Sequence, residues 1–103
     1  MFVRTWRYQV DREASEAFER SYGPDGDWAR LFARGSGFLG TELLSAVDRG
    51  SGDALVYATI DRWRTRQDWD AFLADHGEAY HALDLRLENL TIEEQDLGDW
   101  LSV

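Results

Sequence analysis

Three segments of the chain are rich in apolar, aromatic and β-branched residues, and in the first of them Phe2, Trp6, Tyr8 and Val10 lie on one face while Thr5, Arg7 and Gln9 lie on the other. Alternation with a period of two predicts β-strands that turn one face to a core. The turn-rich residues between the second and third segments predict that these two form an antiparallel hairpin. The three predicted strands are residues 2–10, 38–47 and 54–63, and the connecting turn is residues 49–53.

Between the first two strands the spacing of apolar residues becomes helical. Asp11 is expected to cap a first helix that Gly23 and Pro24 end, and Asp25 or Asp27 is expected to start a second, shorter helix. The polar residues 23–27 allow two interpretations. They are either a simple helix break or the rim of a binding pocket.

A longer helix is predicted from about residue 66. The residues at offsets 0, 3, 4, 7 and 11 from Trp69 lie on one face of this helix. Because Gly77 weakens its middle, either a kinked helix or two consecutive helices is expected. The shared face comprises Trp69, Phe72, Leu73, His76 and Tyr80.

The C-terminal segment contains a capping-box pattern from Thr91 to Glu94, which predicts one more short helix ending at Gly98. Residues 99–103 would then form a last strand. The resulting order of elements is βαββαβ within a single domain, residues 1–103. This order is typical of the α+β, ferredoxin-like fold with a four-stranded antiparallel sheet and, here, subdivided helices.

Charge narrows the classes of partner. The formal net charge is −9 over 103 residues, so nucleic acid and anionic membranes are disfavoured. No run of about 18 apolar residues predicts a membrane span, and the N-terminus is predicted to be a strand rather than a signal peptide, so a cytoplasmic location is expected. A small hydrophobic or aromatic ligand is therefore the expected partner class.

Two absent residue types exclude further chemistry. The chain has no cysteine, which excludes disulfides, thiolate nucleophiles and cysteine-based metal sites. All 11 basic residues are arginine, so a lysine Schiff base is also excluded. His76 and His81 lie on different faces of the predicted helix, which disfavours a two-histidine metal site. No metal, flavin, haem or other cofactor is expected.

His76 is the candidate catalytic residue, because it is the one titratable group in the apolar helix stripe. It is either a general base or a hydrogen-bonded core histidine. Aromatic residues that are expected to converge with it form the candidate substrate-binding set, although each of them could equally be a core residue. These residues are Trp6, Tyr8, Trp63, Phe72 and Tyr80.

Several short motifs occur in an order that resembles the antibiotic biosynthesis monooxygenase (ABM) domain family over nearly the whole chain. The resemblance implies a homodimer, a dimeric α+β barrel in which the two sheets face each other, with a pocket between helices and sheet in each protomer. The motifs are Phe18-Glu19, Tyr22-Gly23-Pro24-Asp25-Gly26-Asp27-Trp28, Leu31-Phe32, Gly37-Phe38-Leu39-Gly40-Thr41-Glu42-Leu43, Ile60-Asp61-Arg62-Trp63 and Ala71-Phe72.

The resemblance implies different reactions in different branches. In the haem-degrading branch the site is an asparagine, a tryptophan and a histidine; the corresponding positions here are Thr5 or Trp6, Phe72 and Ala82. Haem degradation is therefore disfavoured. The branch that oxidises quinols uses tryptophan, asparagine, tyrosine and arginine, of which Trp63 matches.

Two functions of different classes follow. The first is a cofactor-independent monooxygenase acting on a small aromatic substrate, a quinol or a polyketide-like phenol, in which a base removes a proton and the anion reacts with dioxygen. The alternative is a non-catalytic dimeric module that binds a small hydrophobic ligand. The surroundings of His76 are expected to distinguish them.

Overall fold

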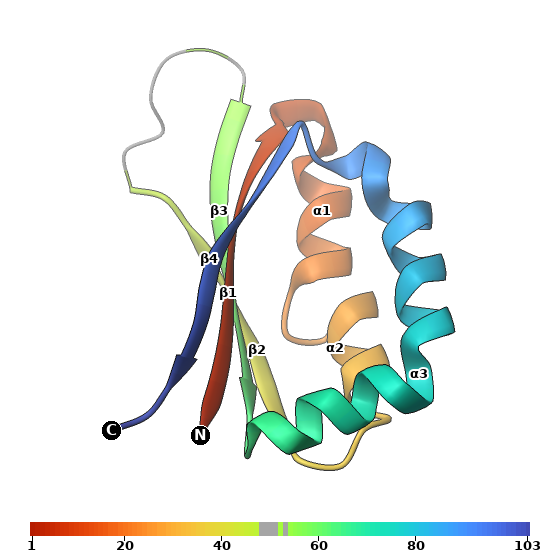
Figure 1. Cartoon of the computed structure of the whole chain (residues 1–103). Coiled ribbons are helices and arrows are strands. Elements are labelled where there is room, and N and C mark those ends of the chain that lie inside the picture. Colours follow the sequence, from red (N-terminus) through yellow and green to blue (C-terminus); the bar gives the residue numbers. More distant parts are fainter. Residues whose placement is uncertain (48–51, 53) are drawn as a thin grey trace.

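The computed structural model describes residues 1–47, 52 and 54–103. Four antiparallel strands form one sheet in the order β2-β3-β1-β4 (Figure 1). The ferredoxin-like α+β fold predicted from the sequence is confirmed. The strands are β1 (Phe2–Asp11), β2 (Phe38–Ser45), β3 (Ala54–Trp63) and β4 (Glu93–Leu101); the helices are α1 (Ser15–Tyr22), α2 (Asp27–Phe32) and α3 (Arg66–Leu87), with 3₁₀ turns η1 (Arg12–Ala14) and η2 (Glu88–Leu90).

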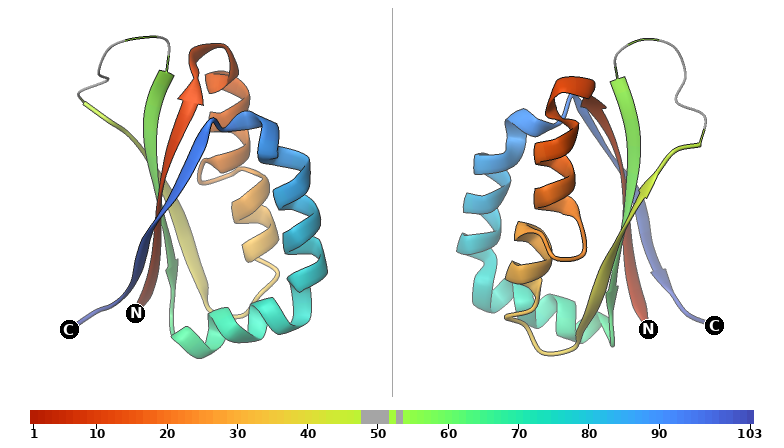
Figure 2. Two further views of the ribbon diagram at one scale, coloured as in Figure 1. Left: turned by 45° about the horizontal axis from the view of Figure 1, so that its top comes forward. Right: turned by 180° about the vertical axis from the view of Figure 1, so that it is seen from behind.

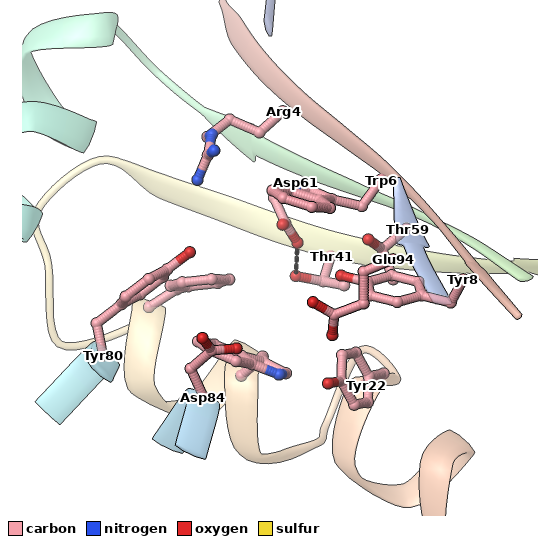
Figure 3. A pocket seen from close by; sticks show the side chains of 12 residues that line it. Arg4, Trp6, Tyr8, Tyr22, Thr41, Thr59, Asp61, Tyr80, Asp84 and Glu94 are labelled. Carbon is pink, nitrogen blue, oxygen red and sulfur yellow. Dashed lines mark hydrogen bonds between the residues drawn. The ribbon is translucent and has the colours of Figure 1, made fainter. Parts of the chain in front are cut away.

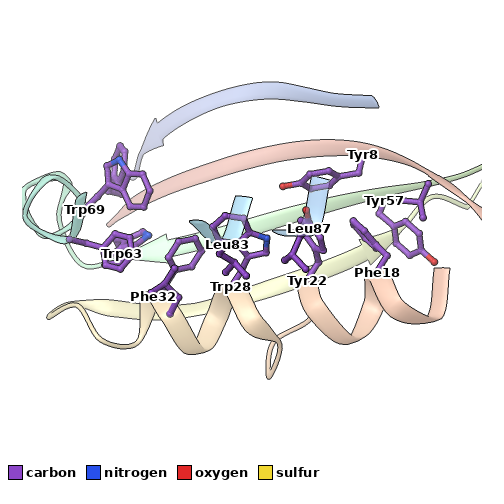
Figure 4. Packing of buried hydrophobic residues seen from close by; sticks show 14 of the residues in the cluster. Tyr8, Phe18, Tyr22, Trp28, Phe32, Tyr57, Trp63, Trp69, Leu83 and Leu87 are labelled. Carbon is purple, nitrogen blue, oxygen red and sulfur yellow. The ribbon is translucent and has the colours of Figure 1, made fainter. Parts of the chain in front are cut away.

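All the helices lie on one face of the sheet, and no helix covers the opposite face (Figure 2). Alternate residues of β1 and β3 point toward the helices and are buried, among them Val10 and Trp63. The core is mainly aromatic, as Figure 4 shows, and Phe18 of α1 stacks on Tyr22 with ring centroids 4.2 Å apart. Aromatic side chains bury a large apolar area each, which a domain of this size needs.

The helices begin and end largely where local chemistry predicts. The carboxylate of Asp11 accepts a hydrogen bond from the backbone N–H of Glu13, so it caps η1 rather than α1 directly. Thr65 caps α3 by accepting from the N–H of Asp68. Inside α3 the backbone of His76 leaves helical geometry (φ −127°, ψ 18°), which confirms the predicted kink one residue before Gly77.

The predicted helix after Thr91 is wrong. Residues 93–101 form β4 instead, and Glu94 pairs with Tyr8 of β1. The Thr91 hydroxyl contacts the Glu94 carboxylate at 3.3 Å, but as a side-chain pair at the entry to a strand. Gly98 (φ 102°) therefore lies at an irregularity of the β1–β4 register rather than at a helix end. The predicted hairpin turn at residues 49–53 lies, except for Gly52, outside the described residues.

None of the helices in the described ranges combines the length and apolar character needed to cross a membrane.

Candidate functional site

A cavity of about 100 Å³ lies between the helix-facing side of the sheet and the helices (Figure 3). For comparison, a cavity of about 150 Å³ accommodates benzene, so this smaller cavity has room for at most one small ring. Side chains from all four strands and all three α-helices contribute to it. The lining residues are Arg4, Trp6, Tyr8, Tyr22, Trp28, Phe32, Thr41, Thr59, Asp61, Tyr80, Asp84 and Glu94.

Aromatic rings form most of the wall. Tyr8 of β1 meets Tyr22 of α1 edge to face, with ring centroids 5.0 Å apart. Trp28 of α2 and Tyr80 of α3 pack together with ring centroids 5.1 Å apart. These contacts fix the rings on four separate elements, so the wall is largely preformed.

Asp61 is the acidic group on the cavity floor. It is on β3, where alternation places it on the same face as Thr59 and Trp63. Its carboxylate accepts a hydrogen bond of 2.6 Å from the hydroxyl of Thr41 on β2. No ion pair in the described ranges involves Asp61, although the carboxylate opens to the cavity.

Burial raises the pKa of Asp61 from 3.8 to about 6, against the opposing effects of the Thr41 hydrogen bond and the charge of Arg4. Desolvation disfavours the ionised form, which is why the shift is upward. Near neutral pH the carboxylate is therefore mostly ionised and more basic than an exposed aspartate. A carboxylate with these properties in a cavity is a candidate general base.

Thr41 is a positioning residue for Asp61. Replacing it with valine removes a hydrogen bond to the ionised form, so the pKa of Asp61 is expected to rise by roughly 1 further unit. The acidic limb of a pH–rate profile would move upward by the same amount. A profile that stays in place in Thr41→Val, with normal stability, would contradict this role.

Arg4 provides a fixed positive charge beside the cavity. Its Nε donates to the Asp99 carboxylate at 3.1 Å, and its guanidinium lies 4.3 Å from the centre of the Trp69 ring. Burial raises the pKa of the Tyr80 phenol, while the neighbouring Arg4 opposes that rise. Arg4 therefore stands where it could stabilise an anion formed in the cavity.

Two buried polar groups face the cavity without a hydrogen bond: the hydroxyl of Thr59 and the indole N–H of Trp28. The phenols of Tyr8 and Tyr22 approach them, but neither approach has hydrogen-bond geometry. Buried polar groups normally have partners, and an unpaired one costs about 1–3 kcal/mol.

The residues predicted from the sequence fall into two groups. Trp6, Tyr8 and Tyr80 line the cavity. The other three lie outside its lining: Trp63 and Phe72 are buried in the aromatic core, and His76 packs against Phe72 at the kink of α3, with ring centroids 5.3 Å apart.

Sequence reasoning missed Asp61, Arg4 and Thr59. A signal was available, because each of them lies on the face of its strand that points toward the helices. Arg4 lies on the same face of β1 as Trp6, and Thr59 and Asp61 lie on the same face of β3 as Trp63. Polar residues at core-facing positions of a strand indicate a site or a buried network. The polar residues 23–26 instead border a separate, shallow depression beside Arg30, away from the aromatic cavity.

Metal binding has no obvious location in this site. The described part of the chain contains no group of three or more histidine, cysteine, aspartate or glutamate side chains arranged to hold a metal ion.

No protein-family model and no curated protein matches this sequence. Solved structures do. A variant of SnoaB, a cofactor-independent oxygenase from Streptomyces nogalater, is 26% identical, with a TM-score of 0.63 over 98% of this chain and 91% of that chain.

Two more distant structures share the fold. A candidate antibiotic biosynthesis monooxygenase of Nitrosomonas europaea is 17% identical (TM-score 0.60; 99% of this chain and 89% of that chain). A dimeric ferredoxin-like protein from an uncultured marine organism is 10% identical (TM-score 0.68; 100% and 95%). The chain is thus a ferredoxin-like domain with an aromatic cavity. Its similarity to antibiotic biosynthesis monooxygenases, inferred from the sequence motifs, is confirmed.

Proposed function

We propose that this protein is a cofactor-independent monooxygenase that oxidises a small hydroxylated aromatic compound, such as a quinol, in the cavity. The observation that carries the proposal is the Asp61 carboxylate, which makes no ion pair among the described residues and is hydrogen-bonded by Thr41 beside an aromatic cavity with room for one small ring at most. The likeness to a cofactor-independent oxygenase supports the same reaction class.

In the proposed reaction Asp61 removes a proton from the substrate. The resulting electron-rich anion is stabilised by Arg4 and by hydrogen bonds from Thr59 and Trp28. This anion transfers an electron to dioxygen, which gives a substrate radical and superoxide. The two combine and form a carbon–oxygen bond at the ring carbon that carries two hydrogens in the keto form of the substrate. Cleavage of the oxygen–oxygen bond leaves a new carbonyl group and releases one water molecule.

The atoms and electrons balance without a cofactor. Conversion of the substrate CH₂ to C=O is a four-electron oxidation, and the same four electrons reduce dioxygen to the carbonyl oxygen and water. The substrate supplies both hydrogens of that water. The protein supplies a base, a positive charge and a water-poor cavity.

The test is oxygen uptake with a panel of single-ring phenols and quinols, with product mass showing the gain of one oxygen atom and the loss of two hydrogens. Substrate-dependent uptake by metal-free protein would support the proposal. Ligand binding without uptake across the panel would favour the alternative of a non-catalytic binding module, which the unpaired Thr59 and Trp28 groups also allow.

His76 provides an informative comparison, since it was the base predicted from the sequence. The ring lies at the kink of α3 beside Phe72, outside the cavity lining. We therefore expect His76→Ala to keep turnover within about threefold of the wild type, whereas loss of a general base costs about 10²–10⁴-fold. If His76→Ala lost turnover by about 10²–10⁴-fold at an unchanged melting temperature, His76 rather than Asp61 would be the general base.

A further inference from the structure

Two carboxylates stand at the mouth of the cavity. Asp84 reaches it from α3 and Glu94 from β4, and Figure 3 shows both side chains pointing into the space between Tyr80 and Tyr22. Burial raises the pKa of Glu94, and the negative charge of Asp84 raises it further, against the hydrogen bond from Thr91. The two groups thus repel each other across the mouth.

Their charges are not neutralised by the protein. Neither carboxylate takes part in any ion pair of the described residues. Arg4 is the one cation among the described residues that line the cavity. Its guanidinium group already pairs with Asp99 and lies over the ring of Trp69. The mouth therefore has a negative potential, which attracts cations.

Other features of the same cavity point to a ligand. Thr59 is 3% exposed and Trp28 is 9% exposed, yet the Thr59 hydroxyl and the Trp28 N–H face the cavity without partners. Both can donate to an oxygen atom on an aromatic ring. Tyr22, Trp28 and Tyr80 line the same cavity as the two carboxylates, and aromatic faces attract cations.

We propose that the cavity selects hydroxylated aromatic compounds that carry a positively charged amine. The ring lies among the aromatic side chains, its hydroxyl reaches Thr59 or Trp28, and the ammonium group lies between Asp84 and Glu94, where it relieves their repulsion. This inference rests on the proposed function for the role of the cavity as a substrate site. Ligand selection can nevertheless be measured without turnover.

The test compares three phenols of nearly equal shape by isothermal titration calorimetry: tyramine, 4-propylphenol and 3-(4-hydroxyphenyl)propanoate. They carry a cationic, a neutral and an anionic tail. We expect tyramine to bind about tenfold more tightly than 4-propylphenol at low ionic strength and the propanoate to bind most weakly. Raising the salt concentration should reduce the tyramine preference.

Matched variants assign the preference to the mouth. The double variant Asp84→Asn/Glu94→Gln should bind tyramine and 4-propylphenol with nearly equal affinity. The control Glu88→Gln/Glu93→Gln removes the same total charge from exposed positions, Glu93 being on the other face of β4 from Glu94, and should keep the tenfold preference.

Three results would overturn the inference: equal affinity of the wild type for tyramine and 4-propylphenol, no tyramine binding at millimolar concentration, or a preference that survives in Asp84→Asn/Glu94→Gln. Failure of the proposed oxygenase reaction would appear differently, as absent oxygen uptake with every quinol while the tyramine preference remains. The two proposals can therefore fail separately.

Discussion

Asp61→Asn is expected to lower substrate-dependent oxygen uptake by about 10²–10⁴-fold, because an amide cannot accept the substrate proton. The same substitution is expected to stabilise the fold at pH 8. Asparagine is neutral and still offers an oxygen to the Thr41 hydroxyl, so the hydrogen bond seen at 2.6 Å can persist without the cost of a buried charge.

The pH dependence of stability gives the second measurement. Because the pKa of Asp61 is about 6 in the folded protein against an ordinary value of 3.8, the folded state binds more protons than the unfolded state between these values. The contribution of Asp61 to the free energy of unfolding therefore falls as pH rises from about 4 to about 6 and is constant above that range. The total loss is at most about 3 kcal/mol, since the carboxylate keeps some exposure to the cavity.

Denaturant unfolding of the wild type and Asp61→Asn from pH 4 to pH 8 measures this contribution. Asp70→Asn is the matched control, because it removes the same charge from a side chain that is 61% exposed. The control should change neither turnover nor the pH dependence. Asp61→Asn with raised stability and undiminished turnover would show that Asp61 is a buried acid without a catalytic role.

The fold was predictable because its main signals are local. Alternation along residues 2–10 and the β-branched and aromatic residues of 54–63 predict these two strands, and residues with helix-stop chemistry, such as Gly23, divide the first helical region. The exception was the segment after Thr91. A capping-box pattern reflects only hydrogen bonds between residues close in sequence. The conformation of this segment is instead determined by the pairing of Glu93 and Glu94 with β1, which is far away in sequence.

The site was harder to predict, for two physical reasons. An ideal helical period of 3.6 residues aligns His76 with Trp69 and Tyr80, but the backbone departs from helical geometry at His76 itself. Trp69 and Tyr80 still contact each other across this kink, whereas His76 lies outside the cavity lining. Asp61 lies near the end of a largely apolar strand in a sequence rich in acids, where a carboxylate is normally solvated. Only the spatial arrangement brings it beside Thr41 and Tyr80.

The open face of the sheet predicts a homodimer. Ile60 lies opposite Thr5 of β1 and Glu42 of β2, on the face that no helix covers (Figure 1). Apolar side chains from all four strands form a patch on this face beside the Arg62–Glu42 ion pair, and a large exposed apolar patch indicates an interface. We expect a second copy of the chain to cover it. The patch contains Val3, Leu44, Val56, Ala58, Ile60 and Trp100.

Ile60→Lys is expected to convert this dimer to a folded monomer. In one protomer the lysine side chain would face solvent beside Glu42, so the fold should survive, whereas in a dimer it would bury an unpaired charge and weaken association by at least about 10²-fold. Leu85→Lys is the control, since Leu85 is 53% exposed on α3, away from the sheet. Sedimentation at micromolar concentration should give dimers for the wild type and Leu85→Lys and monomers for Ile60→Lys. A wild type that sediments as a monomer, or an Ile60→Lys variant that remains dimeric, would show that this face is not the interface.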